Sequence, residues 1–386
     1  MKKYFIIAAA AIAAMACSKV EPTSTPDVKV SFQAANYVPQ TKAGEVSVLN
    51  DFTAFQCRAF LHAEGVDLNA NGTVKTGATD YQEFFGDSGE TISWNSTNKE
   101  WAPSHTYYWP KGTQSFVNFA GWYATTGITP TVSYTYTNSK WTATMNWSFS
   151  NSTVGETGKN IMYADMAWRY QSNADAKYKL DGVTEGVPML FHHALAQINV
   201  KAYAYGNTAA LTAGTTAGTV TDGTATWTIT LTNVKITPVY TAGTLSLTNA
   251  DPVEKKTQAW TGTWAGSGDA GDLERTGSVA VDQIAKPTVG TTTGDVIAAT
   301  CVLPQTIGAT VKLSFDVNIH TAYSAGQSND EVIHKDILLN TMGTNAWAMN
   351  TKYTYFLKVV PSQSKVLFDP ALEADWASVP SEDQAI

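Results

Sequence analysis

The sequence predicts an all-β protein made of sandwich domains. Apolar and polar residues alternate over many short segments, and clusters of Gly, Pro and Asn separate these segments. No long segment has the 3.6-residue apolar period of a helix. The chain has 386 residues, enough for two domains of ordinary size or one large β domain, and its apolar content of 44% supports hydrophobic cores. Together these observations favour β-sandwiches over a helical or a mixed fold.

The first sixteen residues have the layout of a secretory signal peptide. Lys2 and Lys3 form a short cationic region, and residues 5–16, FIIAAAAIAAMA, form an apolar region too short to span a bilayer. Small residues then lead into Cys17, and this pattern resembles a bacterial lipoprotein signal, in which the cysteine thiol carries diacylglycerol. We therefore expect residues 1–16 to be removed and Cys17 to be lipidated. The alternative is an ordinary signal peptide followed by an incidental cysteine.

A lipid-tethered leader, residues 17–42, follows the signal peptide. Residues 18–27 are a polar tether rich in Pro, Ser and Thr, which cannot pack in a core. In VKVSF, residues 28–32, apolar and polar residues alternate, which predicts one short half-buried strand. The inward-facing residues of this leader strand are Val28, Val30 and Phe32. The chain then enters an exposed connection that contains Lys42.

Two stretches of strand-like sequence make up the rest of the chain, and we place the boundary between them near Gly186. Residues 43–185 are rich in aromatic strand segments such as SFVNFAGWYA and KWTATMNWSFS. Residues 186–386 contain the clearest alternation, VKLSFDVNIH, while WTITLTNVKI changes parity at Asn233, which predicts a bulge. Cys57 and Cys301 fall in different predicted domains, so we expect two buried thiols rather than a disulfide.

Charge and motifs exclude several classes of function. Acidic residues outnumber basic ones by 33 to 25, and the absence of a basic run argues against nucleic acid as a partner. No phosphate-binding loop, GxSxG elbow or HExxH metal motif occurs in the sequence. His192 and His193 are adjacent, so in a strand they point to opposite faces and do not converge on one ion. We therefore expect no enzyme activity, no cofactor and no metal site.

Several segments, in this order, resemble the fimbrillin family, the subunits of type V pili in Bacteroidetes. YYWPKGTQSFVNFAGWYA (107–124) resembles the aromatic strand pair of that family, and NIMYADMAW (160–168) resembles the segment before its domain junction. VPMLFHHALAQINVKAYAY resembles the segment that opens its C-terminal domain, and CVLPQTI (301–307) resembles its Leu-Pro-Gln turn. WAMNTKYTYFLKV with DPALEADW resembles its C-terminal strands. These segments span nearly the whole chain after the signal peptide.

The resemblance implies two consecutive β-sandwich domains of transthyretin-like topology, at residues 43–185 and 186–386. It implies a lipoprotein displayed on the outer membrane that acts as a structural or adhesive subunit of a fimbria. The implied partners are other fimbrial subunits, joined by pairing of a donated strand, and the membrane through the lipid. A host receptor or a glycan is a further partner that the resemblance allows, and the shaft, tip and anchor roles stay open.

The resemblance also implies that a trypsin-like protease removes the leader strand and that a strand of a neighbouring subunit replaces it. Lys42 in QTKAG is the expected cleavage position. Arg58 is the alternative, although it lies within the strand-like segment FTAFQCRAFLH, where a protease would have to unfold its substrate. The donor strand is expected within residues 352–360 or 365–369.

A different function class also fits a lipid-anchored, aromatic-rich β protein. A surface glycan-binding lipoprotein of a polysaccharide-uptake system would use exposed aromatic faces, for which Trp94, Trp101, Trp109 and Trp122 are candidates. Trp in a β-sandwich more often belongs to the core than to a binding platform. The exposure of these four side chains therefore discriminates between the two functions.

Overall fold

The computed structural model describes residues 28–36, 52–63, 81–98, 100–111, 114–125, 127–137, 140–151, 159–171, 186–252, 255–286, 295–342 and 345–375. Over these residues the chain forms 27 strands and two short 3-10 helices, Leu339–Met342 and Pro361–Gln363. The predicted all-β class is therefore confirmed. No helix within these ranges has the length and apolarity that crossing a membrane requires.

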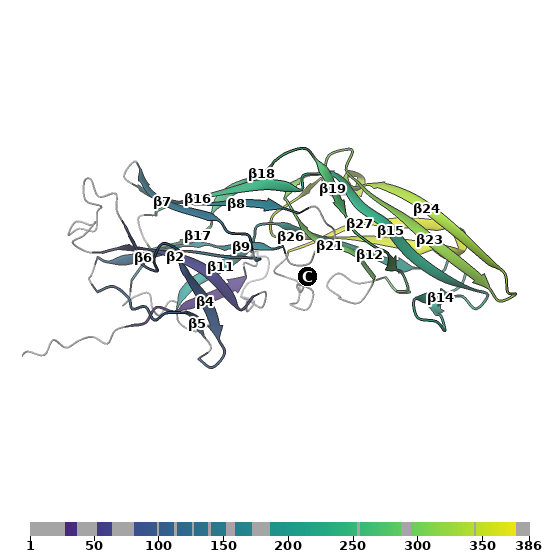
Figure 1. Cartoon of the computed structure of the whole chain (residues 1–386), viewed down its shortest axis with the longest axis horizontal. Coiled ribbons are helices and arrows are strands. Elements are labelled where there is room, and N and C mark those ends of the chain that lie inside the picture. The colour runs from purple at the N-terminus through teal and green to yellow at the C-terminus, as the bar shows by residue number, and fades with distance from the viewer. Residues whose placement is uncertain are drawn as a thin grey trace, which may run out of the picture.

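Seven strands close into a barrel, at the end of the molecule where β2, β4, β6 and β11 lie in Figure 1. They pair in the order β6-β9-β11-β1-β5-β4-β2, and an additional pairing of β2 with β6 closes the ring. Three further strands, β3 (Gln82–Glu83), β10 (Met166–Tyr170) and β17 (Lys256–Gln258), extend this sheet at its margins. The barrel strands are β1 (Phe32–Asn36), β2 (Ala54–His62), β4 (Glu90–Asn95), β5 (Glu100–Pro103), β6 (Phe116–Ala124), β9 (Ile161–Ala164) and β11 (Val187–His193).

A four-stranded sheet packs beside the barrel and shares a core with it. Its order is β18-β16-β8-β7, and the strands are β7 (Thr131–Thr137), β8 (Lys140–Ser150), β16 (Ala242–Ala250) and β18 (Thr261–Gly266). Trp141 and Trp147 from β8 are buried together with Leu245 from β16 and Trp168 from β10. The indole of Trp260 donates a hydrogen bond to the Ala164 carbonyl oxygen at 2.8 Å, which fastens this sheet to the barrel.

Two sheets form a sandwich at the other end of the molecule (Figure 1). One has the order β21-β12-β26-β27, and the other runs β13-β14-β15-β23-β24, with β19 and β20 also paired to β15. Residues of β12 and β26 pack against residues of β15 and β23 in one core. The strands are β12 (Ala196–Ala204), β13 (Thr212–Ala213), β14 (Thr219–Thr221), β15 (Ala225–Val239), β19 (Gly271–Glu274), β20 (Val279–Ala280), β21 (Asp295–Val302), β23 (Lys312–Tyr323), β24 (Ser328–Leu338), β26 (Thr351–Val360) and β27 (Lys365–Asp375).

The sheets do not follow the predicted boundary near Gly186. β11, β16, β17 and β18 come after this residue, but β11 completes the barrel, β17 extends its sheet and β16 pairs with β8. The pairing between β22 (Gln305–Thr306) and β25 (Ala346–Trp347) stays within the later part of the chain. The division into domains of residues 43–185 and 186–386 therefore stays a prediction. The sheets themselves contain strands from both sides of this boundary.

Candidate functional site: the leader-strand groove

The leader strand β1 is an internal strand of the barrel. It runs parallel to β11 over five residue pairs, from Phe32 with Val187 to Asn36 with Phe191. Within the described strands it meets β5 at a single antiparallel pair, Phe32 with Trp101. Because β11 and β5 flank it, withdrawing β1 would open the barrel between them and leave backbone donors and acceptors of β11 unpaired.

The residues before β1 follow a different path. Lys29 forms an isolated bridge with Tyr108, the Val30 amide donates to the Tyr107 carbonyl at 2.9 Å, and the Trp109 amide donates to the Val28 carbonyl at 3.0 Å. The strand therefore begins at Phe32, four residues later than the alternation predicts. Val28 is 40% exposed because this part of the leader pairs with a loop at the rim of the barrel and not with the sheet.

Phe32 is the central side chain of the leader. It is 1% exposed and meets the Phe119 ring edge-on, with ring centroids 5.4 Å apart. The Phe55 ring lies edge-on at 6.1 Å. Val30 is also buried, so two of the three predicted inward-facing leader residues line the barrel core. Burial of a Phe side chain contributes about 1.5–3 kcal/mol, so Phe32 is the main apolar anchor of this strand.

Gly186 allows β11 to approach the leader closely. Its φ is +155°, and a Cβ atom at this position would lie 2.8 Å from the backbone carbonyl carbon of Phe32. The next amide, of Val187, donates to the Ser31 carbonyl oxygen at 2.9 Å. A side chain at residue 186 would therefore disturb the backbone pairing that holds the leader in its groove.

A buried carboxylate lies beside the groove. Glu90, at the start of β4, is 6% exposed and accepts hydrogen bonds from the Ser104 hydroxyl, from the Tyr107 hydroxyl at 2.8 Å and from the His105 ring, whose Nδ1 lies at 3.0 Å. Burial alone would raise the pKa of Glu90, but these three hydrogen bonds outweigh it and lower the pKa. Burial, together with the neighbouring carboxylate, raises the pKa of Tyr107 to about 12.

Of the predicted lipidation and cleavage residues, only Arg58 lies within the described part of the chain. Cys17 and Lys42 lie outside the described residues. Arg58 lies in the middle of β2, where it donates to the Val132 carbonyl oxygen at 2.7 Å and forms an ion pair with Glu83. A protease would have to remove β2 from the barrel to reach this residue, as expected from its sequence.

The two adjacent histidine rings, of His192 and His193, have separate surroundings. Nε2 of His192 lies 2.7 Å from Oδ1 of Asp165, and the ring stacks on Tyr163. The His193 ring is 1% exposed, and its Nδ1 lies 3.2 Å from Oδ1 of Asn160. The two rings occupy separate environments, and the described residues contain no group of three side chains suited to a metal ion.

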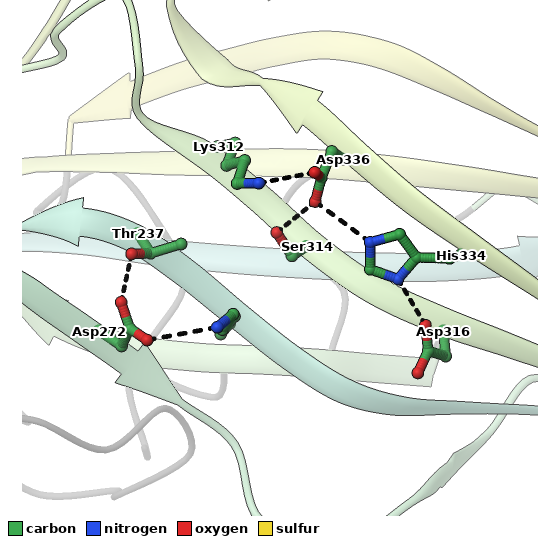
Figure 2. A network of polar contacts seen from close by, with 8 residues as sticks. Thr237, Asp272, Lys312, Ser314, Asp316, His334 and Asp336 are labelled. Carbon is green, nitrogen blue, oxygen red and sulfur yellow. Dashed lines mark hydrogen bonds and ion pairs between the residues drawn. The ribbon is translucent and has the colours of Figure 1, made fainter.

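The polar network around Asp336 and the two buried thiols are also accounted for by their neighbours in the fold. Figure 2 shows Asp336 bound by Lys312 and Ser314, with His334 between Asp336 and Asp316, on the outer face of β23 and β24. These side chains are paired with one another on an exposed sheet face. Cys57 and Cys301 are free and buried, and burial raises the pKa of both thiols, that of Cys301 to about 12, so neither is a reactive thiolate.

The aromatic platform proposed for glycans is largely absent from the described surface. Trp101, Trp109 and Trp122 are at most 6% exposed and belong to the cores, while Trp94 alone of the four candidates is substantially exposed, at 38%. Sequence reasoning missed two features of this end of the molecule. It did not show that the leader closes a barrel, and it did not single out Glu90, because a lone Glu at the start of a strand is usually exposed.

Comparison with known proteins identifies the family. The fimbrillin-like family model matches residues 64–376. A fimbrial protein from Bacteroides vulgatus is 14% identical and aligns over 90% of this chain and 99% of its own, with a TM-score of 0.48. The fimbrial anchor protein Mfa2 from Porphyromonas gingivalis is 8% identical over 91% of this chain and 98% of its own, with a TM-score of 0.27. No curated protein matches. The family match covers most of the chain and supports a structural, fimbrial role, and the chain therefore belongs to the fimbrillin-like family.

Proposed function

We propose that this chain is a structural subunit of a cell-surface fimbria that assembles by strand exchange. The observation that carries the proposal is the position of β1, which precedes every other described strand and yet fills an internal place in the barrel. A strand near a chain end can leave without breaking the connections between the remaining strands. The gap would then accept an extended strand through main-chain hydrogen bonds and apolar pockets.

In this proposal the chain is exported and anchored before it assembles. Residues 1–16 are removed, Cys17 is lipidated, and residues 17–42 tether the folded part to the outer membrane. The folded part keeps the predicted chain order of two transthyretin-like sandwich units, residues 43–185 and 186–386, with β11, β16, β17 and β18 of the second unit built into the layers of the first. Labelling of cells with an alkyne analogue of palmitate should mark the natural chain and leave Cys17→Ala unlabelled. Equal labelling of both proteins would remove the lipid anchor from the proposal.

Cleavage after Lys42 would separate the leader from the rest of the chain. Lys42 lies between β1, which ends at Asn36, and β2, which begins at Ala54. A cut at this position leaves every described strand after β1 intact. Arg58 would be a poorer position because cleavage there would divide β2.

A short sequence pattern supports β27 of a second copy as the strand that replaces the leader. The leader contains Lys-Val-Ser-Phe at residues 29–32, and β27 begins with Lys-Val-Leu-Phe at residues 365–368. The alternation also agrees, because Val366 and Phe368 pack against their core, as Val30 and Phe32 do. Phe368 of one copy would then take the place of Phe32 in another.

The position of β27 favours it over the other candidate, β26. Among the described strands, β27 pairs only with β26 and lies at the margin of its sheet. β26 pairs on both sides, with β12 and β27, and its Tyr355 and Leu357 are fully buried. Withdrawing β26 would break a core, whereas β27 has one set of main-chain hydrogen bonds to lose.

Trypsin treatment of the purified chain tests this function. The natural protein should be monomeric, lose its leader on cleavage and then form a ladder of oligomers, while Lys42→Ala should block both changes. Phe368→Ala should still be cleaved but should form few oligomers, because its donor strand lacks the aromatic anchor. Leu367→Ala, at the neighbouring exposed position, is the matched control. A cleaved natural chain that stays monomeric would contradict a shaft role.

A further inference from the structure

Residues 102–107, the end of β5 and the loop after it, bulge away from the leader and leave a cavity. Two contacts define the bulge, Phe32 with Trp101 and Lys29 with Tyr108. Between them the leader advances by three residues and the opposite segment by seven. A cavity of about 270 Å³ lies between the two segments, lined by leader residues 29–31 and by residues of the bulge that include Ala102, His105 and Tyr107. The bulge therefore cannot be held in place by continuous pairing with the leader.

Glu90 holds the bulge from its other side. Its carboxylate binds the side chains of Ser104, His105 and Tyr107, which are all in the bulge. The Ser104 amide also donates to the Thr91 carbonyl oxygen at 3.0 Å, so the bulge is tied to β4 through backbone and side chains. Hydrogen bonds to a charged group are stronger than hydrogen bonds between neutral groups.

The same bulge supplies the rim contacts of the leader. The carbonyl of Tyr107 and the amide of Trp109 bind Val30 and Val28, and no sheet strand pairs with these two leader residues in the described part of the chain. A connected path therefore runs from the Glu90 carboxylate, through Tyr107, to the backbone of the leader. Loss of the carboxylate would loosen the bulge and with it the first residues of the leader.

We propose that Glu90 is the positioning residue that sets how firmly the groove retains its leader strand. Its three hydrogen bonds fix the bulge in the conformation that pairs with residues 28–30. This role rests on the proposed function for its consequence, which is that Glu90 sets the rate at which a cleaved leader departs. The retention itself is a property of the uncut chain and can be measured without any cleavage.

Hydrogen exchange of the uncut full-length chain, followed by mass spectrometry, tests the positioning role. In Glu90→Gln the amides of residues 28–36 should exchange at least about tenfold faster than in the natural chain, as expected for loss of hydrogen bonds to a charge. Tyr107→Phe, which removes one of these bonds and little volume, should give a smaller but clear increase, of about three- to tenfold. Glu100→Gln is the matched control, because Glu100 lines the cavity and binds only Asn98 among the described hydrogen bonds.

The outcomes distinguish the positioning role of Glu90 from the strand-exchange function. Equal exchange of residues 28–36 in all four proteins, or faster exchange in β23 as well as in the leader, would overturn the positioning role of Glu90. Tyr107→Phe keeps the test decisive if Glu90→Gln fails to fold. After trypsin cleavage, Glu90→Gln and Tyr107→Phe should lose the leader faster than the natural chain and Glu100→Gln. If no protein loses its leader after cleavage, the strand-exchange function is wrong, whatever the exchange rates show.

Discussion

At the scale of single residues, Arg169 joins the barrel to the neighbouring sheet. It lies in β10 with a left-handed backbone, φ +60°, and its amide donates to Oδ1 of Asn118 at 2.7 Å. Its guanidinium binds both oxygens of Asp251, at 2.9 and 2.7 Å, and lies over the Phe116 ring. The Asp251 side chain is 4% exposed, so this carboxylate depends on Arg169 for its compensating charge.

Removal of the charge on the Arg169 side chain should therefore destabilise the folded protein. We expect Arg169→Met to lower the free energy of unfolding by about 3 kcal/mol, because it leaves Asp251 buried without its counter-charge. Urea unfolding followed by tryptophan fluorescence measures this change. Lys312→Met is the control, since its partner Asp336 is 41% exposed and such surface pairs are worth less than about 1 kcal/mol. Equal losses in the two variants would contradict this account.

His193 should make stability depend on pH. Burial, followed by repulsion from Lys352 and His192, holds the pKa of His193 well below its ordinary value of 6.5. The unfolded chain binds a proton at this residue below pH 6.5 and the folded chain does not, so the free energy of unfolding falls as the pH drops below 6.5. The slope from this one group is at most about 1.4 kcal/mol per pH unit.

Replacement of His193 by Gln should remove this slope. Urea unfolding at pH 7.5 and pH 5.5 should show a smaller difference in His193→Gln than in the natural chain. His320→Gln changes a ring that is 48% exposed and serves as the control. An unchanged pH dependence in His193→Gln would show that other groups cause it.

At the scale of elements, β24 is a long edge strand protected by charge. Within the described residues it pairs only with β23. Glu331 and Lys335 alternate with Ile333 and Ile337 on its inward face, and Val332 is 65% exposed on the other. Charges among the inward-facing residues of an edge strand oppose pairing with a second chain.

Replacement of this charge should cause self-association. Lys335→Ile extends the apolar face of β24, so we expect oligomers or aggregates that grow with protein concentration in light scattering. Asn146→Ile in β8 is the control, because this exposed residue pairs on both sides, with Thr131 of β7 and Ser246 of β16. If both variants remain monomeric at the same concentrations, the charge on β24 is not needed to protect the edge.

Alternation predicted elements well where one sheet face is buried. The segment 311–320 forms most of β23, and the parity change at Asn233 corresponds to a register shift between Thr232 and Lys235, with φ +52° at Asn233. Partners of strands were not predictable, because pairing in a sheet depends on residues far apart in the chain. For the same reason the sequence placed the leader strand four residues early, and it could not show that Glu90 receives donors from a loop.

At the scale of the whole molecule, strands from the later part of the chain complete the earlier part. The barrel needs β11, and β8 needs its partner β16. Asn151, next to the end of β8, donates to the Thr300 hydroxyl at 2.9 Å and the Cys301 carbonyl at 3.0 Å, so the two parts are also joined by buried polar contacts. Their stabilities are therefore linked.

A fragment that ends at the predicted boundary should not fold on its own. Residues 1–185 lack β11, β16, β17 and β18, so this fragment should show broad unfolding without a cooperative transition in circular dichroism. A fragment extended to residue 270 contains all four strands and is the matched comparison. A cooperative transition in the shorter fragment would show that the earlier part is independent.

The separation of β1 from β2 along the chain has a kinetic consequence. While residues 37–53 connect the two strands, the leader competes for its groove as part of the same molecule, at an effective concentration of about a millimolar. A strand of a second copy at micromolar concentration cannot displace such a competitor. A cut in this connection alters no contact between β1 and the barrel, but it turns rebinding of the leader into a second-order reaction. In the proposed assembly the departed leader stays in the membrane through its lipid while the rest of the chain separates from it, so the cut would set the direction of the exchange through concentration rather than through affinity.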